Sequence, residues 1–109
     1  MRCLQPAPKP GKPLASRAVR QSARDQSCTL RLAGCLPGNE TVVLAHVRGV
    51  WCGIGQKPAD CVAVYACAAC HDKLDGRAGD RPDGWDVVRA MAETLERMTA
   101  SGLLWMKGA

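Results

Sequence analysis

Cysteine is the residue type that most constrains how this chain can fold. Seven cysteines occur among 109 residues, whereas there is no phenylalanine and there are only three tryptophans and one tyrosine. Because large aromatic side chains usually supply much of the energy of a small core, this core is expected to be small and aliphatic. A domain of this kind usually needs disulfides or a bound metal for stability.

The cellular compartment decides whether the cysteines form disulfides or bind a metal. The first residues of the chain contain no apolar segment typical of a secretory signal. No stretch approaches the ~18 consecutive apolar residues of a membrane span. We therefore expect a cytoplasmic protein, not attached to a membrane, whose thiols stay reduced. The cysteines are then metal ligands or free thiols, and an odd count leaves one of them unpaired in any disulfide scheme.

Four of the cysteines form two pairs whose spacing indicates a metal site. Cys67 and Cys70 are a C-x-x-C pair where an expected strand meets an expected helix, and a wider pair lies upstream. Four thiolates from two such pairs can bind one tetrahedral Zn²⁺ at ~2.3 Å. We therefore predict a structural zinc bound by Cys28, Cys35, Cys67 and Cys70. We interpret the other three, Cys3, Cys52 and Cys61, as small buried apolar residues.

The second pair is also compatible with other chemistries. Cys67-Ala-Ala-Cys70-His71 has the C-x-x-C-H spacing of covalent haem attachment, and C-x-x-C pairs occur in thioredoxin-like redox proteins. Haem attachment takes place outside the cytosol and would leave Cys28 and Cys35 without a role. Since no βαβ pattern surrounds the pair either, the zinc site is favoured.

The rest of the pattern predicts a small α+β domain. β-branched residues indicate strands over 40–46 and 62–66, and a glycine-rich connection over 47–60 joins them. A short helix is expected over 68–75, stopped by Gly76. Because strands and helix follow one another closely, the cysteine pairs should be brought together around this hairpin.

A longer helix and an apolar end complete the predicted domain. Apolar residues at helical spacing predict an amphipathic helix over 84–99, and Asp83 is suited to cap its first turn. The apolar run over 103–106 is expected to form a closing strand, and it is a surface through which two chains could form a homodimer.

The N-terminal region differs in composition from the rest. Residues 1–24 contain six basic residues, four prolines and no acidic residue, which is typical of an extended, disordered arm. Such an arm can lie along phosphate backbones, or it can be a solvated tail without a specific role. Part of 14–24 could instead form a short helix. We therefore divide the chain into a basic arm, 1–24, and a zinc-stabilised domain, 25–109.

The two histidines of the chain occupy places suited to catalysis. His46 ends the first expected strand, and His71 directly follows Cys70. One step along a helix rotates a side chain by about 100°, so His71 should face away from the zinc and toward the hairpin. With Asp60, they could meet in one cleft, hold a hydrated divalent metal and activate water. The alternative is two ordinary core or surface imidazoles, with Asp75 as a solvated charge at the helix end.

Several spaced motifs resemble the YbcO-like prophage nucleases, which are of the HNH, or ββα-metal, endonuclease class. The motifs are Leu44-Ala45-His46, the run from Cys52 to Pro58, Asp60, and Cys67-Ala-Ala-Cys70-His71-Asp72. The resemblance implies a treble-clef core in which the four cysteines bind zinc. It also implies that His46 is the general base, that His71 binds a catalytic Mg²⁺ or Mn²⁺, and that Asp60 lies near the position of the residue that orients the base.

Two functions follow from these residues. The first is a metal-dependent DNA endonuclease that hydrolyses phosphodiester bonds, with Arg48, Lys57, Lys73, Arg77 and the basic arm on phosphates. The second is a non-catalytic, zinc-stabilised module of phage origin that binds nucleic acid, or a phage or host recombination protein. Ala45 is the reason for considering this second function, because many HNH sequences have a second metal ligand at that position, directly before the catalytic histidine.

Overall fold

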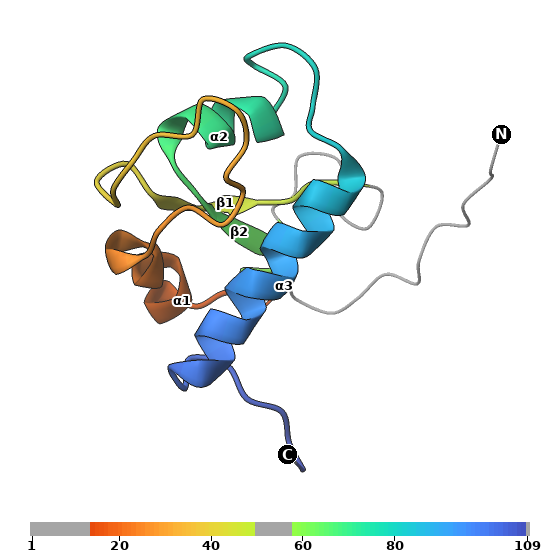
Figure 1. The fold of residues 1–109 in the computed structure, drawn as a ribbon. Coiled ribbons are helices and arrows are strands. Elements are labelled where there is room, and N and C mark those ends of the chain that lie inside the picture. Colours follow the sequence, from red (N-terminus) through yellow and green to blue (C-terminus); the bar gives the residue numbers. More distant parts are fainter. Residues whose placement is uncertain (1–13, 50–57, 109) are drawn as a thin grey trace, which may run out of the picture.

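The computed structural model describes residues 14–49 and 58–108 and has the α+β architecture predicted from the sequence (Figure 1). A two-stranded antiparallel hairpin is surrounded by three α-helices and one short 3₁₀ helix. In chain order, the elements are α1 (Arg17–Gln21), η1 (Ser22–Asp25), β1 (Val43–His46), β2 (Ala63–Ala66), α2 (Ala68–Leu74) and α3 (Gly84–Ala100).

The hairpin lies at the centre of the domain. Leu44 pairs with Tyr65 and His46 with Ala63, and every residue of β2 is buried. Both strands are shorter than predicted. In particular, β1 begins at Val43 and not at residue 40, because the turn after Pro37 continues until the amide of Val42 donates to the carbonyl of Asn39. Most of the glycine-rich connection lies outside the described residues.

The free edge of β2 is covered by side chains from a loop and from α3. The carbonyl of Tyr65 accepts from the amide of Thr29 at 2.7 Å and from its hydroxyl at 3.0 Å. The amide of Tyr65 donates to the hydroxyl of Thr94 at 3.3 Å. An unpaired strand edge exposes backbone groups that must find partners when buried. Thr29 and Thr94 supply those partners where a third strand would otherwise stand.

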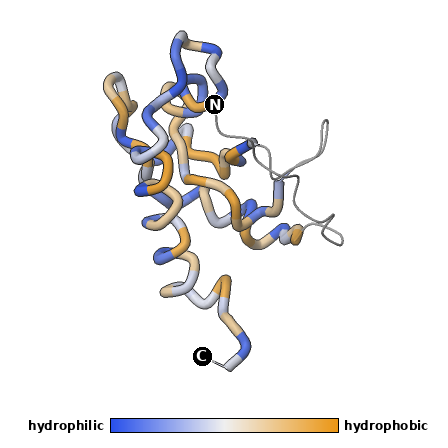
Figure 2. Tube along the Cα trace, turned by 90° about the vertical axis from the view of Figure 1, so that its right-hand side faces the viewer, coloured by the Kyte–Doolittle hydropathy of each residue, from blue (hydrophilic) through white to orange (hydrophobic). Residues whose placement is uncertain are grey.

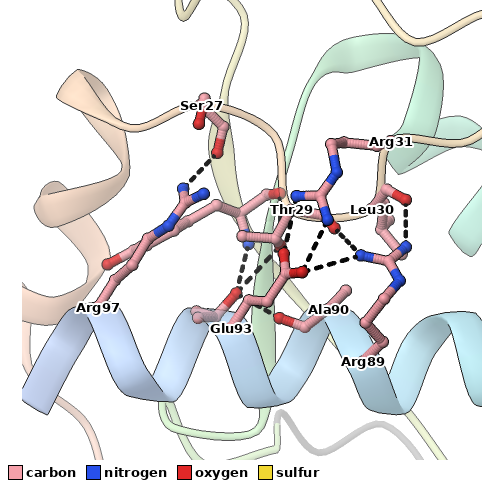
Figure 3. A network of polar contacts seen from close by, with 10 residues as sticks. Ser27, Thr29, Leu30, Arg31, Arg89, Ala90, Glu93 and Arg97 are labelled. Carbon is pink, nitrogen blue, oxygen red and sulfur yellow. Dashed lines mark hydrogen bonds and ion pairs between the residues drawn. The ribbon is translucent and has the colours of Figure 1, made fainter.

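Arginines of α3 fasten the loop over residues 27–31 to the helix (Figure 3). The loop carries the first cysteine of the predicted metal site, and Arg31 within it has a left-handed backbone, with φ 47°. The bonds, each 2.7–2.9 Å, run from Arg89 to the carbonyls of Thr29 and Leu30, from Arg97 to that of Ser27, and from Arg31 to Glu93. The loop is therefore held by side chains that come from far along the sequence.

Helix α3 confirms the helix predicted from apolar spacing, but its buried face differs from the predicted one, because Trp85 and Val88, two of the apolar residues at that spacing, are exposed. The carboxylate of Asp83 accepts from the amide of Trp85 at 2.7 Å, which is the predicted cap. Ala90, Thr94 and Met98 are buried at intervals of four residues, and Figure 2 shows hydrophobic and hydrophilic residues alternating along the helix. One face of α3 therefore packs on the hairpin, where it contacts β2.

The predicted closing strand over 103–106 is wrong. Gly102, with φ 80°, follows the helix, and the amides of Gly102 and Leu103 donate back to the carbonyls of Thr99 and Met98. This is the Schellman arrangement, which ends a helix and redirects the chain. Leu103 and Leu104 still pack against the core, and the chain then leaves the body of the domain, where Trp105 and Met106 are exposed (Figure 1). An apolar run does not become a strand when no strand edge is available to pair with it.

The described part of the expected arm, residues 14–24, folds against the domain. The short helix considered as an alternative there is confirmed as α1, capped by the hydroxyl of Ser16. Val19 and Ala23 are buried in the core, and α1 and η1 both contact β1. The folded part of the chain thus includes residues that were assigned to the arm. No described helix is long and apolar enough to cross a membrane.

Thr94→Val tests the role of the threonine that covers the sheet edge. Valine keeps the shape of the side chain but leaves the buried amide of Tyr65 without an acceptor. An unsatisfied buried donor costs about 1–3 kcal/mol, and we expect that loss in the free energy of unfolding measured by urea denaturation. Thr99→Val is the matched control, because Thr99 is exposed and its hydroxyl donates to the carbonyl of Glu96 within the same helix. Equal stability of the two variants would contradict this account.

Candidate metal centre and adjoining cleft

The four predicted cysteines come together in one cluster. The sulfur atoms of Cys28, Cys35, Cys67 and Cys70 all lie within 4.8 Å of one another, and those of Cys35 and Cys67 are 3.8 Å apart. Ligands bound tetrahedrally to zinc at ~2.3 Å lie about 3.8 Å apart. Both the donor set and the spacing therefore fit a tetrahedral metal ion. Within 14–49 and 58–108, no other group of three or more His, Cys, Asp or Glu side chains is gathered in this way.

Local structure places each sulfur. Cys28 belongs to the loop fastened by α3, and Cys35 follows a tight turn in which its amide donates to the carbonyl of Leu32 at 2.9 Å. Cys67 caps α2, and Cys70 lies in the first turn of that helix. Because β2 leads directly into α2, Cys67 and Cys70 are brought next to the upstream pair of cysteines.

The thiols of the cluster differ in acidity. Burial raises the pKa of Cys35 to about 11 and also raises that of Cys70. Burial opposes ionisation of Cys67 as well, but the backbone amides of Cys70 and Leu36 donate to its sulfur and lower its pKa to about 7. Four such close sulfurs cannot all be thiolates without a cation to compensate their charge. A metal ion held by these four residues would supply that charge.

The remaining cysteines do not join this cluster. Cys61 is partly buried and lies at the start of the turn into β2, so it is less enclosed than predicted. Cys3 and Cys52 lie outside the described residues.

His46 and Asp60, both predicted site residues, are in direct contact. His46 ends β1, and its Nε2 lies 2.9 Å from Oδ1 of Asp60. The other oxygen of Asp60 accepts from the amide of Ser16 at 2.6 Å and from Nη1 of Arg20 at 2.9 Å. Burial acts to raise the pKa of Asp60, but these three donors outweigh it and lower the pKa. An ionised carboxylate, itself held by α1, thus fixes the imidazole.

Sequence analysis missed the part that α1 has in this contact. Arg20 and Ser16 were counted with the arm, although they hold Asp60 across 40 and 44 residues of chain. The only local signal was the alternative of a helix within 14–24. Nothing in the spacing of those residues indicates a carboxylate partner so far along the sequence.

His71 has a carboxylate partner of its own. Its Nε2 lies 3.3 Å from Oδ2 of Asp75, one helical turn later, while the preceding Cys70 is buried in the cluster. The side chain therefore contacts Asp75 on its own helix and is not part of the four-cysteine cluster. Because Asp60 is engaged by His46 and α1, the structure gives two histidine–carboxylate pairs and not a single group of His46, His71 and Asp60.

A cleft of about 250 Å³ connects the two pairs. His46 lines it from the hairpin and Asp75 from the end of α2, and the loop before α3 forms another wall. Its lining residues are His46, Val47, Arg48, Leu74, Asp75, Arg81, Pro82 and Val87. A ligand in this cleft would contact the imidazole of His46 and the carboxylate that touches His71.

The predicted phosphate-binding residues have different surroundings. Arg48 lines the cleft, whereas Lys73 donates to the carbonyl of Ala33. Arg77 pairs with Asp72 at 2.9 Å and with Asp75 at 3.2 Å. Lys57 lies outside the described residues. Arg81, which the sequence did not single out, also lines the cleft.

Comparison with known proteins places the chain in a family. The family described as "Putative nuclease YbcO" matches residues 17–105. Proteins of that name from Escherichia coli (strain K12) and Enterobacteria phage 82 are each 41% identical over 92 residues, covering 82% of this chain and 91% of theirs. A solved structure, "Structure of a putative bacteriophage protein from Escherichia coli str. K-12 substr. MG1655", is 34% identical, with a TM-score of 0.61, over 78% of this chain and 100% of that one. The chain belongs to the YbcO family, which is named for nuclease activity.

Proposed function

We propose that this protein is a metal-dependent DNA endonuclease of the HNH type, in which His46 is the general base. The observation that carries the proposal is the contact of His46 with the buried carboxylate of Asp60 at the wall of a cleft. A histidine fixed by a carboxylate and open to a cleft is suited to take a proton from water. The family name points to the same reaction class.

We infer different tasks for the two ring nitrogens of His46. Because Asp60 is ionised, it accepts a hydrogen bond from Nε2–H of His46, and the lone pair is then on Nδ1. Nδ1 takes a proton from water as the water oxygen bonds to phosphorus, and the bond from phosphorus to the leaving sugar oxygen breaks. Asp60 stabilises the imidazolium that forms, and Arg20 and Ser16 keep Asp60 in place.

His71 and Asp75 are the residues that would hold the catalytic divalent ion. An imidazole and a carboxylate are suitable ligands, and their atoms are 3.3 Å apart. Neighbouring ligands of an octahedral ion at ~2.1 Å lie about 3 Å apart, so the pair fits. When bound, Mg²⁺ or Mn²⁺ would stabilise negative charge on the phosphate and the leaving oxygen.

We propose that the four-cysteine cluster holds a structural Zn²⁺ within a treble-clef core. The order of a cysteine-bearing loop, a hairpin and a helix that supplies the second pair supports this assignment. Zinc bound there would fix α2, and with it His71, relative to the hairpin that carries His46. Arg48, Lys57 and the basic N-terminal residues would then contact DNA phosphates, while Lys73 and Arg77 mainly stabilise the fold.

The second candidate is a zinc-stabilised binding module without catalysis. Ala45 is buried and supplies no ligand beside His46, which is the observation that favours it. Such a module needs the cysteines and basic residues but has no requirement for His46.

Metal removal tests the zinc assignment. We expect one zinc per chain, and we expect excess chelator to unfold the domain, because metal binding and folding are coupled. Cys67→Ser should lose zinc and melt at a much lower temperature, whereas Cys61→Ser, outside the cluster, should keep its zinc. Elemental analysis and thermal melts measure both. A melting curve that chelator does not change would overturn the four-thiolate site.

His46→Ala tests the base. General-base catalysis contributes about 10²–10⁴-fold, so Mg²⁺- or Mn²⁺-dependent nicking of plasmid DNA should fall by this factor while zinc content and helicity stay unchanged. Nicking that survives the substitution would contradict the role of His46. Absence of nicking by the unmodified protein in any divalent metal, together with DNA binding, would favour the binding module.

Asp60→Asn tests the ionised carboxylate. The pKa of Asp60 is lowered on folding, so its contribution to stability is full above the unfolded pKa of about 3.9 and is lost as pH falls through the folded pKa. The difference in unfolding free energy between the parent and Asp60→Asn should therefore be constant near neutral pH and shrink in acid. Asp25→Asn, an exposed acid in η1, is the control. A difference that does not depend on pH would mean that Asp60 is not ionised in the fold.

A further inference from the structure

We propose that Arg81 binds a phosphate group of the nucleic-acid backbone in the cleft that contains His46. This inference rests on the proposed nuclease function, because it assigns the site a second substrate-binding group. Arg81 lies in the loop between α2 and α3 and lines the same cleft as His46 and Asp75.

Gly76 leaves space for the Arg81 side chain beside the backbone. A Cβ atom at Gly76 would lie 3.5 Å from Nε and 3.6 Å from Cγ of Arg81. The stem of the arginine thus packs over the backbone where α2 ends, and Pro82 stiffens the chain immediately after it. The side chain therefore lies beside the end of α2, and no described ion pair holds its guanidinium.

Arg81 differs from the neighbouring cations in having no partner within the chain. Lys73 donates to a backbone carbonyl, and Arg77 pairs with Asp72 and Asp75. In the described parts of the chain, Arg81 makes no hydrogen bond or ion pair. Its five N–H donors are thus available to a ligand, and their planar arrangement matches two oxygens of a phosphate.

The charges around the cleft favour an anion beside Arg81. Asp75 is the one acidic residue among the cleft's described lining, and it already pairs with Arg77 at 3.2 Å, which it shares with Asp72. The buried Asp60 is compensated by Arg20 in the same way. Asp80 and Asp86 line a neighbouring pocket with Lys73 and not this cleft. Arg81 is therefore a cation of the cleft that no described carboxylate pairs with, and phosphodiesters are the anions that a nuclease must bind.

DNA binding without divalent metal tests Arg81 independently of cleavage. Each phosphate contact changes the slope of log K against log salt by about 0.9 for duplex DNA. For a short duplex, Arg81→Ala should lower the magnitude of this slope by about one. Its loss of affinity relative to the parent should then be about three- to fourfold larger at 50 mM than at 200 mM salt. Arg81→Lys should keep the slope but not the full affinity, because lysine retains the charge and loses the planar fork.

Lys107→Ala is the matched control, since Lys107 is an exposed cation far along the chain from the cleft residues. Its slope should fall less than that of Arg81→Ala, and all variants should melt at the parent temperature. An Arg81→Ala slope equal to that of the parent, or no binding of duplex by the parent, would overturn the phosphate site. DNA binding that depends on Arg81, combined with no nicking in any metal, would overturn the nuclease and leave the phosphate site standing.

Discussion

Close approach of four sulfur atoms is the constraint on which the rest of the domain depends. Cys35 and Cys67 are separated by 32 residues, yet their sulfurs are 3.8 Å apart. The contact joins the turn before Cys35 to the strand–helix junction after β2, and Cys28 brings the loop held by α3 to the same cluster. Because the chain has no phenylalanine and few aromatic residues, we propose that metal binding at this cluster supplies stability that aromatic side chains supply in other cores. A metal ion at its centre would cancel the charge of thiolates that burial otherwise disfavours.

A second constraint, around Asp60, connects the fold to the proposed chemistry. One carboxylate meets the amide of Ser16, the guanidinium of Arg20 and the imidazole of His46. Helix α1 therefore stabilises the domain and fixes the orientation of His46 through the same contact. In this account, the N-terminal helix belongs to the site even though it has no side chain among the cleft's described lining.

The parts of the fold that could be predicted are those with a signal in the local amino-acid sequence. Helical periodicity and the Asp83 cap identify α3, and C-x-x-C spacing identifies one half of the cysteine cluster. Contacts between distant segments have no local sequence signal, and the ion pair of Arg20 with Asp60 is an example. The strand predicted over 103–106 does not form because a strand needs the edge of another strand to pair with. Thr29 and Thr94 already cover the free edge of β2. Arg81 was overlooked because its place in the cleft depends on how the loop before α3 folds back.

X-ray absorption at the zinc edge, on protein purified without added metal, measures the central claim most directly. The account predicts one zinc per chain with four sulfur neighbours at ~2.3 Å and no nitrogen or oxygen in the first coordination shell. A shell that contains histidine nitrogen or water, or a folded protein that holds no zinc, would contradict it.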